Sequence, residues 1–332
     1  MPAATTAPMD RLQIVTVPQL RLPTFAEDVA AGLGASPKRL NSKYFYDAVG
    51  SALFDAITYL PEYYLTRAET DVLREWGWEI VRALGNPVEF IELGSGSATK
   101  TRLLIEETLR VQRTLRYSPI DISAEALRAA ASSLVDSYPA LRVSGYVGDY
   151  LSVLDTPHLN RDDRVLVMFM GSNIGNYEPA EAVALLRRIA AMLKPADGLL
   201  LGADLKKDRR ELLLAYDDPA GVTAAFNKNI LARINRELGG SFDVKNFEHV
   251  VEYEEEGGGL HSYLAAASEQ NVNIGEIGLQ LHFEPGDRIH TESAYKYSPE
   301  SIAQMASSAG LSVARSWTDP AQRFSVNLLV RA

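Results

Sequence analysis

The segment from Val88 to Ser97, VEFIELGSGS, constrains the fold of this chain more than any other. Its first six residues read as a short buried strand. Gly94 and Gly96 then form a glycine turn, where the lack of a Cβ lets backbone approach a ligand closely. A helical pattern opens near Lys100. Strand, glycine turn and helix in this order indicate a nucleotide-binding turn, with a purely structural turn as the alternative.

The third glycine of a dinucleotide fingerprint is missing from this turn, because Thr99 stands in its place. The motif therefore does not favour a pyrophosphate. Glu92, just before the glycines, would repel a diphosphate but suits a cationic sulfonium ligand. A nicotinamide-dependent oxidoreductase is disfavoured on the same grounds.

Strand-length and helix-length segments alternate around this motif. We expect strands at 88–93, 115–120, 142–147, 164–170 and 198–203, and helices at 66–84, 100–111, 123–138 and 180–193. Strands separated by helices predict a parallel, doubly wound sheet. A helix at 299–309 and strands at 311–318 and 324–331 resemble the last units of the same sheet.

The pattern changes between residues 207 and 294. Helical stretches at 209–217 and 221–238 are followed by alternating segments typical of an antiparallel element. Such an excursion often adds a substrate lobe to a cofactor domain. We expect an acidic run at 252–256 to be a solvated loop. The predicted organisation is a disordered lead-in at 1–17, a substrate-binding lobe at 18–65 plus 207–294, and a cofactor-binding domain at 66–206 plus 295–332.

Acids and glycines follow the predicted strands, where doubly wound sheets bind their ligands. Asp121 ends the second strand, Asp149 and Tyr150 follow the third, and Gly171 follows the fourth. An acid at this place can accept hydrogen bonds from ribose hydroxyls, and an acid beside an aromatic ring suits adenine. Each acid alone is more often a turn former or a helix cap. Together they predict an adenosine site without phosphates, which is typical of a class I S-adenosylmethionine-dependent methyltransferase.

The composition argues against several other functions. The formal net charge is -10 and no basic run is present, which disfavours nucleic acid as a partner. Cysteine is absent, so disulfides and thiolate chemistry are excluded. The five histidines lack ligand spacing, and we expect no metal site. No membrane-span or signal-peptide pattern occurs. We expect a cytoplasmic monomer without a membrane partner, acting on a small molecule.

Several longer strings resemble the L-histidine Nα-methyltransferase family of ergothioneine biosynthesis. They are KYFYDAVGS at 43–51, LPEYY at 60–64, ELGSG at 92–96, GSNIGN at 171–176, YDDPAGVTAAFN at 216–227 and HTESAYKY at 290–297. The similarity runs in register from about Leu40 to the C-terminus. It implies an α/β, Rossmann-like class I methyltransferase sheet with an added α+β substrate-binding lobe. It also implies S-adenosylmethionine as cofactor and trimethylation of free L-histidine to hercynine.

The resemblance further implies roles for individual residues. The positions that contact the cofactor in the family correspond here to Gly94, Lys100, Asp121, Asp149 and Tyr150, and we add Ser95, Gly96 and Gly171 as parts of the glycine turns. Tyr63, Asn176 and Tyr216 fall where the family holds the amino and carboxylate groups of the substrate. Tyr46 and Glu292 fall where it lines the pocket and binds the imidazole.

Two positions depart from the family pattern. Ala294 replaces the serine that usually stands two residues after the glutamate, and Ser262 aligns with a position that is hydrophobic in some members. The lost hydroxyl removes a hydrogen bond to the imidazole, on the order of 1 kcal/mol. Ser262, Ser293 or a water are candidates to replace it. The departures leave open another amino-acid substrate (tryptophan, tyrosine or phenylalanine), and a non-catalytic adenosine-binding protein is a further alternative.

Overall fold

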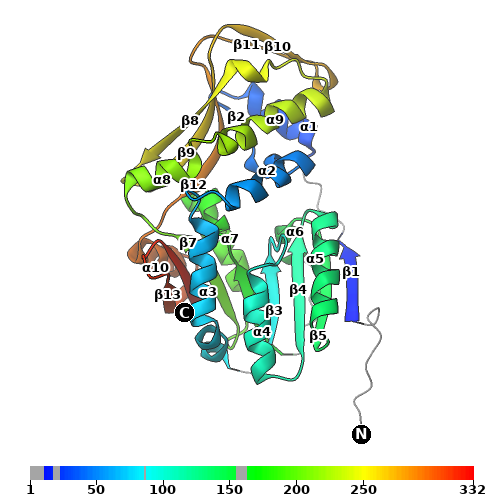
Figure 1. Ribbon diagram of the computed structural model, residues 1–332, viewed down its shortest axis with the longest axis vertical. Coiled ribbons are helices and arrows are strands. Elements are labelled where there is room, and N and C mark those ends of the chain that lie inside the picture. Colours follow the sequence, from blue (N-terminus) through cyan, green and yellow to red (C-terminus); the bar gives the residue numbers. More distant parts are fainter. Residues whose placement is uncertain (1–10, 18–22, 86, 155–162) are drawn as a thin grey trace. The chain divides into compact units, whose positions relative to one another are not determined.

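The structure is a computed structural model that describes residues 11–17, 23–85, 87–154 and 163–332. The chain divides into two compact units, which are described one at a time (Figure 1). Unit 1 comprises Met1–Leu20, Arg67–Leu205 and Tyr297–Ala332, and unit 2 comprises Arg21–Thr66 and Lys206–Lys296.

Unit 1 is built on an eight-stranded sheet with the order β1-β5-β4-β3-β6-β7-β14-β13. Its strands are β1 (Leu12–Thr16), β3 (Val88–Leu93), β4 (Leu115–Asp121), β5 (Leu141–Val147), β6 (Arg164–Phe169), β7 (Gly198–Asp204), β13 (Leu311–Thr318) and β14 (Phe324–Arg331). Strands β1 and β3 to β7 pair in parallel, whereas β14 is antiparallel to β7 and β13. Every residue of β3 and β7 is buried, as in strands covered on both faces.

The helices that accompany this sheet are α3 (Leu65–Leu84), α4 (Thr101–Val111), α5 (Ala124–Ser137), α6 (Tyr150–Leu154), α7 (Pro179–Met192) and α10 (Pro299–Ser308). Their apolar faces are buried, as Leu104 of α4 and Leu134 of α5 illustrate. The chain runs outward from β3 to β4 and β5, then returns to the other side of β3 as β6. The carboxyl ends of β3 and β6 therefore form the switch point at which such sheets bind ligands. The predicted doubly wound fold is confirmed.

Two sequence expectations are wrong. The segment 1–17 is not a disordered lead-in throughout, because β1 pairs with β5 from Leu12 opposite Val143 to Thr16 opposite Val147. Residues 1–10 and 18–22 lie outside the described residues. The acidic run is not entirely a loop either, because Glu252 and Glu254 lie in strand β8 (Phe247–Glu254). Both glutamates occupy exposed positions of the strand, and a strand with one solvated face accommodates such charges.

Unit 2 contains a four-stranded sheet with the order β2-β12-β9-β8 and a separate hairpin of β10 and β11. Its other strands are β2 (Lys38–Arg39), β9 (Gly259–Ala266), β10 (Gln270–Ile274), β11 (Leu279–Phe283) and β12 (Arg288–Tyr295). Its helices are α1 (Phe25–Gly34), α2 (Ala48–Thr58), α8 (Arg209–Tyr216) and α9 (Val222–Leu238). Short 3-10 turns lie at η2 (Ser42–Phe45), η4 (Val244–Asn246) and η5 (Gly275–Ile277). Its apolar core joins helix α9 to the sheet, through residues that include Phe226, Ile230, Phe247, Leu264 and Ile289.

Candidate active site

The glycine turn after β3 has the backbone that its sequence predicts. The φ angles of Gly94 and Gly96 are +74° and +50°, a left-handed region that glycine adopts without strain. The backbone N–H groups of Gly94 and Ser95 both donate to the carbonyl of Ile120, at 2.9 and 3.2 Å. The Gly96 N–H donates to Asp121 Oδ2 at 2.8 Å. Asp121 therefore lies beside the turn and holds it against the end of β4.

Glu92 has a different role from the one that its position suggests. Its side chain is buried, Thr101 Oγ1 donates to the carboxylate at 2.8 Å, and the Tyr117 hydroxyl donates to it as well. Burial raises the pKa of Glu92 to about 7, although these hydrogen bonds and the Lys100 charge act to lower it. The carboxylate braces β3 against β4 and α4. The expectation that it faces a sulfonium is therefore not supported.

Lys100 is held by a residue that the sequence analysis did not single out. Its ammonium pairs with Glu69 of α3, whose side chain is fully buried. The other carboxylate oxygen of Glu69 accepts a hydrogen bond from the Gly171 N–H at 2.7 Å. Gly202 makes room for this side chain, since a Cβ there would lie 2.5 Å from Glu69 Oε1. Glu69 thus connects the start of α4 to the turn after β6. As one acid in a helix, it carries no sequence signal for this role.

Tyr150 and Asp149 stand where β5 leads into α6. The Tyr150 hydroxyl is hydrogen-bonded to that of Tyr177, and its ring packs 5.7 Å from the ring of Phe169. Burial raises the pKa of Tyr150, and the nearby Tyr177 and Asp149 act in the same direction. Asp149 Oδ1 accepts a hydrogen bond from the Ser152 N–H at 3.4 Å. The result is a rigid, neutral phenol beside a carboxylate.

Asn176 is the last residue of the 3-10 turn η3 (Asn173–Asn176), and its side chain is exposed. The turn is anchored on both sides. Ser172 Oγ accepts a hydrogen bond from the Asp204 N–H at 2.9 Å, and the Tyr297 hydroxyl donates to the carbonyl of Ile174 at 3.2 Å. Asn176 therefore projects from a firmly held turn of unit 1.

The predicted substrate residues of unit 2 come from distant segments and are brought together by aromatic contacts. The Tyr46 ring lies 5.5 Å from Phe54, Phe54 lies 6.1 Å from Tyr63, and Tyr63 lies 6.4 Å from Tyr216. Tyr46 is 45% exposed, yet desolvation at its hydroxyl and the charge of Glu292 raise its pKa, so this hydroxyl lies in the field of that carboxylate.

A bulge in β12 decides the direction of Glu292. Ile289 is opposite Leu264 of β9 and His290 is opposite Tyr263, but the next pair is Glu292 with Ser262, so Thr291 is an extra residue. Side chains alternate between the faces of a strand, and an extra residue shifts the alternation by one. Without it, Glu292 would share the outer face of His290. With it, Glu292 lies on the core-facing side.

Lys296 follows Glu292 and Ala294 at alternating positions, and it was also not singled out from the sequence. Its side chain is buried, and its ammonium donates to the Tyr216 hydroxyl at 2.6 Å. Burial raises the pKa of Glu292 to about 7, and the charge of Lys296 acts to lower it. A lysine in register with inward-facing positions was an available signal. This part of unit 2 thus combines an acid, an ammonium and several phenols.

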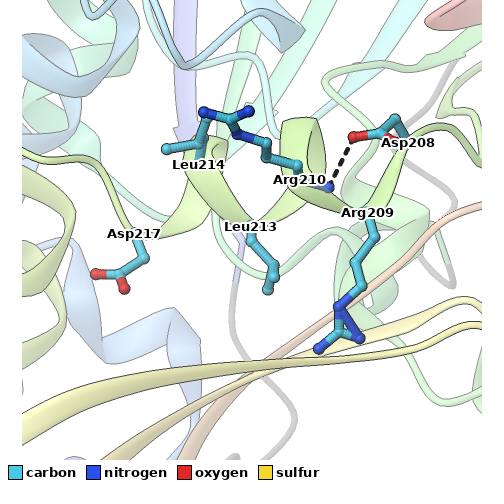
Figure 2. Close-up of a pocket in the computed structure, with 6 residues that line it drawn as sticks. All are labelled: Asp208, Arg209, Arg210, Leu213, Leu214 and Asp217. Carbon is cyan, nitrogen blue, oxygen red and sulfur yellow. Dashed lines mark hydrogen bonds between the residues drawn. The ribbon is translucent and has the colours of Figure 1, made fainter.

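An open hollow of about 430 Å³ lies along α8 (Figure 2). It is lined by Asp208, Arg209, Arg210, Leu213, Leu214 and Asp217. Asp208 caps the helix by accepting a hydrogen bond from the Arg210 N–H at 2.9 Å, the contact drawn in Figure 2. None of the predicted site residues lines this hollow, and we assign it no function.

The described part of the chain contains neither a metal-binding cluster nor a membrane-spanning helix. No cluster of three or more histidine, aspartate or glutamate side chains there is arranged to hold a metal ion. No helix there combines the length and the apolar character needed to cross a bilayer.

Comparison with known proteins identifies the family. Residues 25–331 match the model of a family described as histidine-specific, S-adenosylmethionine-dependent methyltransferases. The chain is 44% identical over 305 residues to a histidine N-alpha-methyltransferase of Mycolicibacterium smegmatis, covering 92% of this chain and 94% of that protein. The corresponding protein of Mycobacterium tuberculosis is 40% identical over 304 residues, with the same coverage.

A longer relative, ergothioneine biosynthesis protein 1 of Schizosaccharomyces pombe, is 33% identical over 276 residues, covering 80% of this chain and 35% of that protein. The matches extend across both units, and the sheet of unit 1 has the class I methyltransferase architecture. This chain therefore belongs to the family of histidine-specific, S-adenosylmethionine-dependent methyltransferases and is a methyltransferase.

Proposed function

We propose that this enzyme methylates the α-amine of free L-histidine three times, forming hercynine for ergothioneine biosynthesis. The observation that carries the proposal is the bulge of β12, which turns Glu292 toward the aromatic cluster of unit 2. An acid there suits a ring N–H of the substrate imidazole. The names of the bacterial and yeast relatives support the same reaction.

The residues of unit 1 fit S-adenosylmethionine. The glycine turn exposes backbone at the switch point, Asp121 lies beside it, and Asp149 and Tyr150 stand at the end of the neighbouring strand. We assign Asp121 to the ribose hydroxyls and Asp149 with Tyr150 to adenine. The bound cofactor supplies a methyl group activated by a positively charged sulfur. Gly94, Lys100 and Gly171 shape this cofactor-binding site and hold its turns in place.

The residues of unit 2 fit an amino acid, and the resemblance to the family assigns Asn176 of unit 1 to the same substrate. Tyr216 donates to the substrate carboxylate, and the buried ammonium of Lys296 favours an anion at that place. Tyr63 and Asn176 orient the α-amine, which must lose its proton before it attacks. Glu292 holds the imidazole at the far end of the substrate. Little covalent chemistry is asked of these side chains, so positioning dominates the catalysis.

Anchoring at both ends explains repeated transfer. The carboxylate and the imidazole stay bound while the amine rotates to present its lone pair again after each methylation. The faces of Tyr46 and Tyr63 favour the growing positive charge on the amine by cation–π attraction. This retains the mono- and dimethylated intermediates.

The test is mass spectrometry of histidine after incubation with the enzyme and S-adenosylmethionine. The expected result is three successive methyl additions, ending in a trimethylated product. A parallel panel of tryptophan, tyrosine and phenylalanine identifies the competing substrates. Methylation of one of these without methylation of histidine would refute the proposal.

A further inference from the structure

Ser262 has a buried hydroxyl that the fold does not use. The residue is 1% exposed, and within the residues that the structure describes its Oγ makes no hydrogen bond. Buried hydroxyls are usually paired, because an unpaired one loses its hydration without compensation. A polar group retained at such a place points to a partner that binds there.

The backbone around Ser262 is firmly held. Thr291 Oγ1 donates to the Ser262 carbonyl at 3.0 Å and also contacts Asn227 Oδ1 at 2.6 Å. Ser262 lies directly opposite Glu292 in the pairing of β9 with β12. Side chains of such a pair leave the same face of the sheet with Cβ atoms about 5 Å apart. The unused hydroxyl therefore neighbours the acid that we assign to the imidazole.

The other candidate hydroxyl is excluded by its direction. Ser293 Oγ lies 3.0 Å from Nδ1 of His261 and 3.1 Å from Nε2 of His290, on the opposite face of the sheet. Ala294 shares the face of Glu292 but carries no hydroxyl. Among these three positions, Ser262 alone offers a hydroxyl on the side of Glu292.

We infer that Ser262 is a specificity-determining residue whose hydroxyl hydrogen-bonds the second ring nitrogen of the substrate imidazole. The inference rests on the proposed methylation of histidine. A neutral imidazole has one N–H and one bare nitrogen. The Glu292 carboxylate accepts from the N–H, and the Ser262 hydroxyl donates to the bare nitrogen. The pair thus recognises a neutral ring that carries both groups, and Ser262 compensates for the hydroxyl missing at position 294.

The test compares Ser262→Ala with the matched variant Ser293→Ala. For Ser262→Ala we expect the KM for histidine to rise about tenfold, the usual worth of one such hydrogen bond. The inhibition constant of 3-(2-thienyl)alanine, whose ring has no nitrogen, should not change. Without histidine, the Tm of Ser262→Ala should rise because an unpaired buried hydroxyl is removed. Ser293→Ala should lower the Tm and leave the KM unchanged.

A rescue variant completes the experiment. Adding Ala294→Ser to Ser262→Ala returns a hydroxyl to the face of Glu292 and should restore most of the lost affinity for histidine. An unchanged KM in Ser262→Ala, or an equal loss for histidine and thienylalanine, would overturn the inference while leaving histidine methylation intact. Absence of any methylated histidine with the wild-type enzyme would instead refute the proposed function, and this inference with it.

Discussion

The ammonium of Lys296 donates a 2.6 Å hydrogen bond to the Tyr216 hydroxyl and lies 4.2 Å from the centroid of the same ring. Lys296 is only 2% exposed. The contact joins the strand that carries Glu292 to the end of helix α8. It holds a cation beside the phenol assigned to the substrate carboxylate, and the charge of this cation also acts on the acid assigned to the imidazole.

Lys296→Gln should therefore weaken histidine binding in two ways. Tyr216 loses its buried donor, and the pKa of Glu292 rises above about 7 because the nearby positive charge is gone. We expect the KM for histidine to increase at least tenfold at neutral pH. The loss of affinity on acidification should begin at a higher pH. Steady-state kinetics between pH 6 and 9 measure both effects. Lys206→Gln, which removes a surface lysine of the same unit, is the control, and equal behaviour of the two variants would contradict the assignment.

Glu292→Ala should raise the KM for histidine tenfold or more, the usual worth of a charge-assisted hydrogen bond of roughly 1.5–3 kcal/mol. The KM for S-adenosylmethionine should stay the same. Because the pKa of Glu292 is about 7, the wild-type carboxylate becomes protonated as the pH falls from 8 to 6 and loses the charge that strengthens its hydrogen bond from the ring N–H. Glu292→Gln should lack this component of the pH profile. Glu252→Ala, at an exposed acid of β8, is the control; an unchanged KM in Glu292→Ala would remove Glu292 from the site.

Glu92 predicts the direction in which stability changes with pH. Burial raises its folded-state pKa from 4.5 to about 7. The folded protein therefore binds more protons than the unfolded chain between these values, and stability falls as the pH rises through this window. Above pH 7 the ionised Glu92 carboxylate destabilises the folded protein by roughly 3 kcal/mol. Urea unfolding at several pH values should show a shallower decline for Glu92→Gln than for the wild type. If the unfolding free energies of the two proteins changed with pH in parallel, ionisation of Glu92 would not destabilise the folded protein.

Glu69→Gln should lower the affinity for S-adenosylmethionine about tenfold without changing the KM for histidine. The amide keeps an acceptor for the Gly171 N–H but removes the charge that holds Lys100. Isothermal titration calorimetry with the cofactor measures the effect. Glu107→Gln changes an acid of α4 that pairs with Arg110 on the surface and serves as the control. Equal cofactor affinity of Glu69→Gln and wild type would show that Lys100 reaches its position without the charge of Glu69.

Much of the sheet in unit 1 was predictable. Strand β3 begins and ends where its sequence indicates, at Val88 and Leu93, because an apolar run bounded by a glycine turn leaves little freedom. Strands β13 and β14 also match their predicted bounds. Strand β1 was missed because its five residues are recognisable as a strand only beside β5. The roles assigned to the site residues remain predictions.

By itself, the sequence determined the doubly wound fold, the missing phosphate fingerprint and the family, because these depend on local patterns and on strings read along the chain. The tertiary structure decided which groups meet. Glu69 reaches Gly171 across 102 positions, and one extra residue at Thr291 turns Glu292 toward Ser262. Contacts between distant segments and the register of paired strands arise from packing the whole chain, so no local pattern records them.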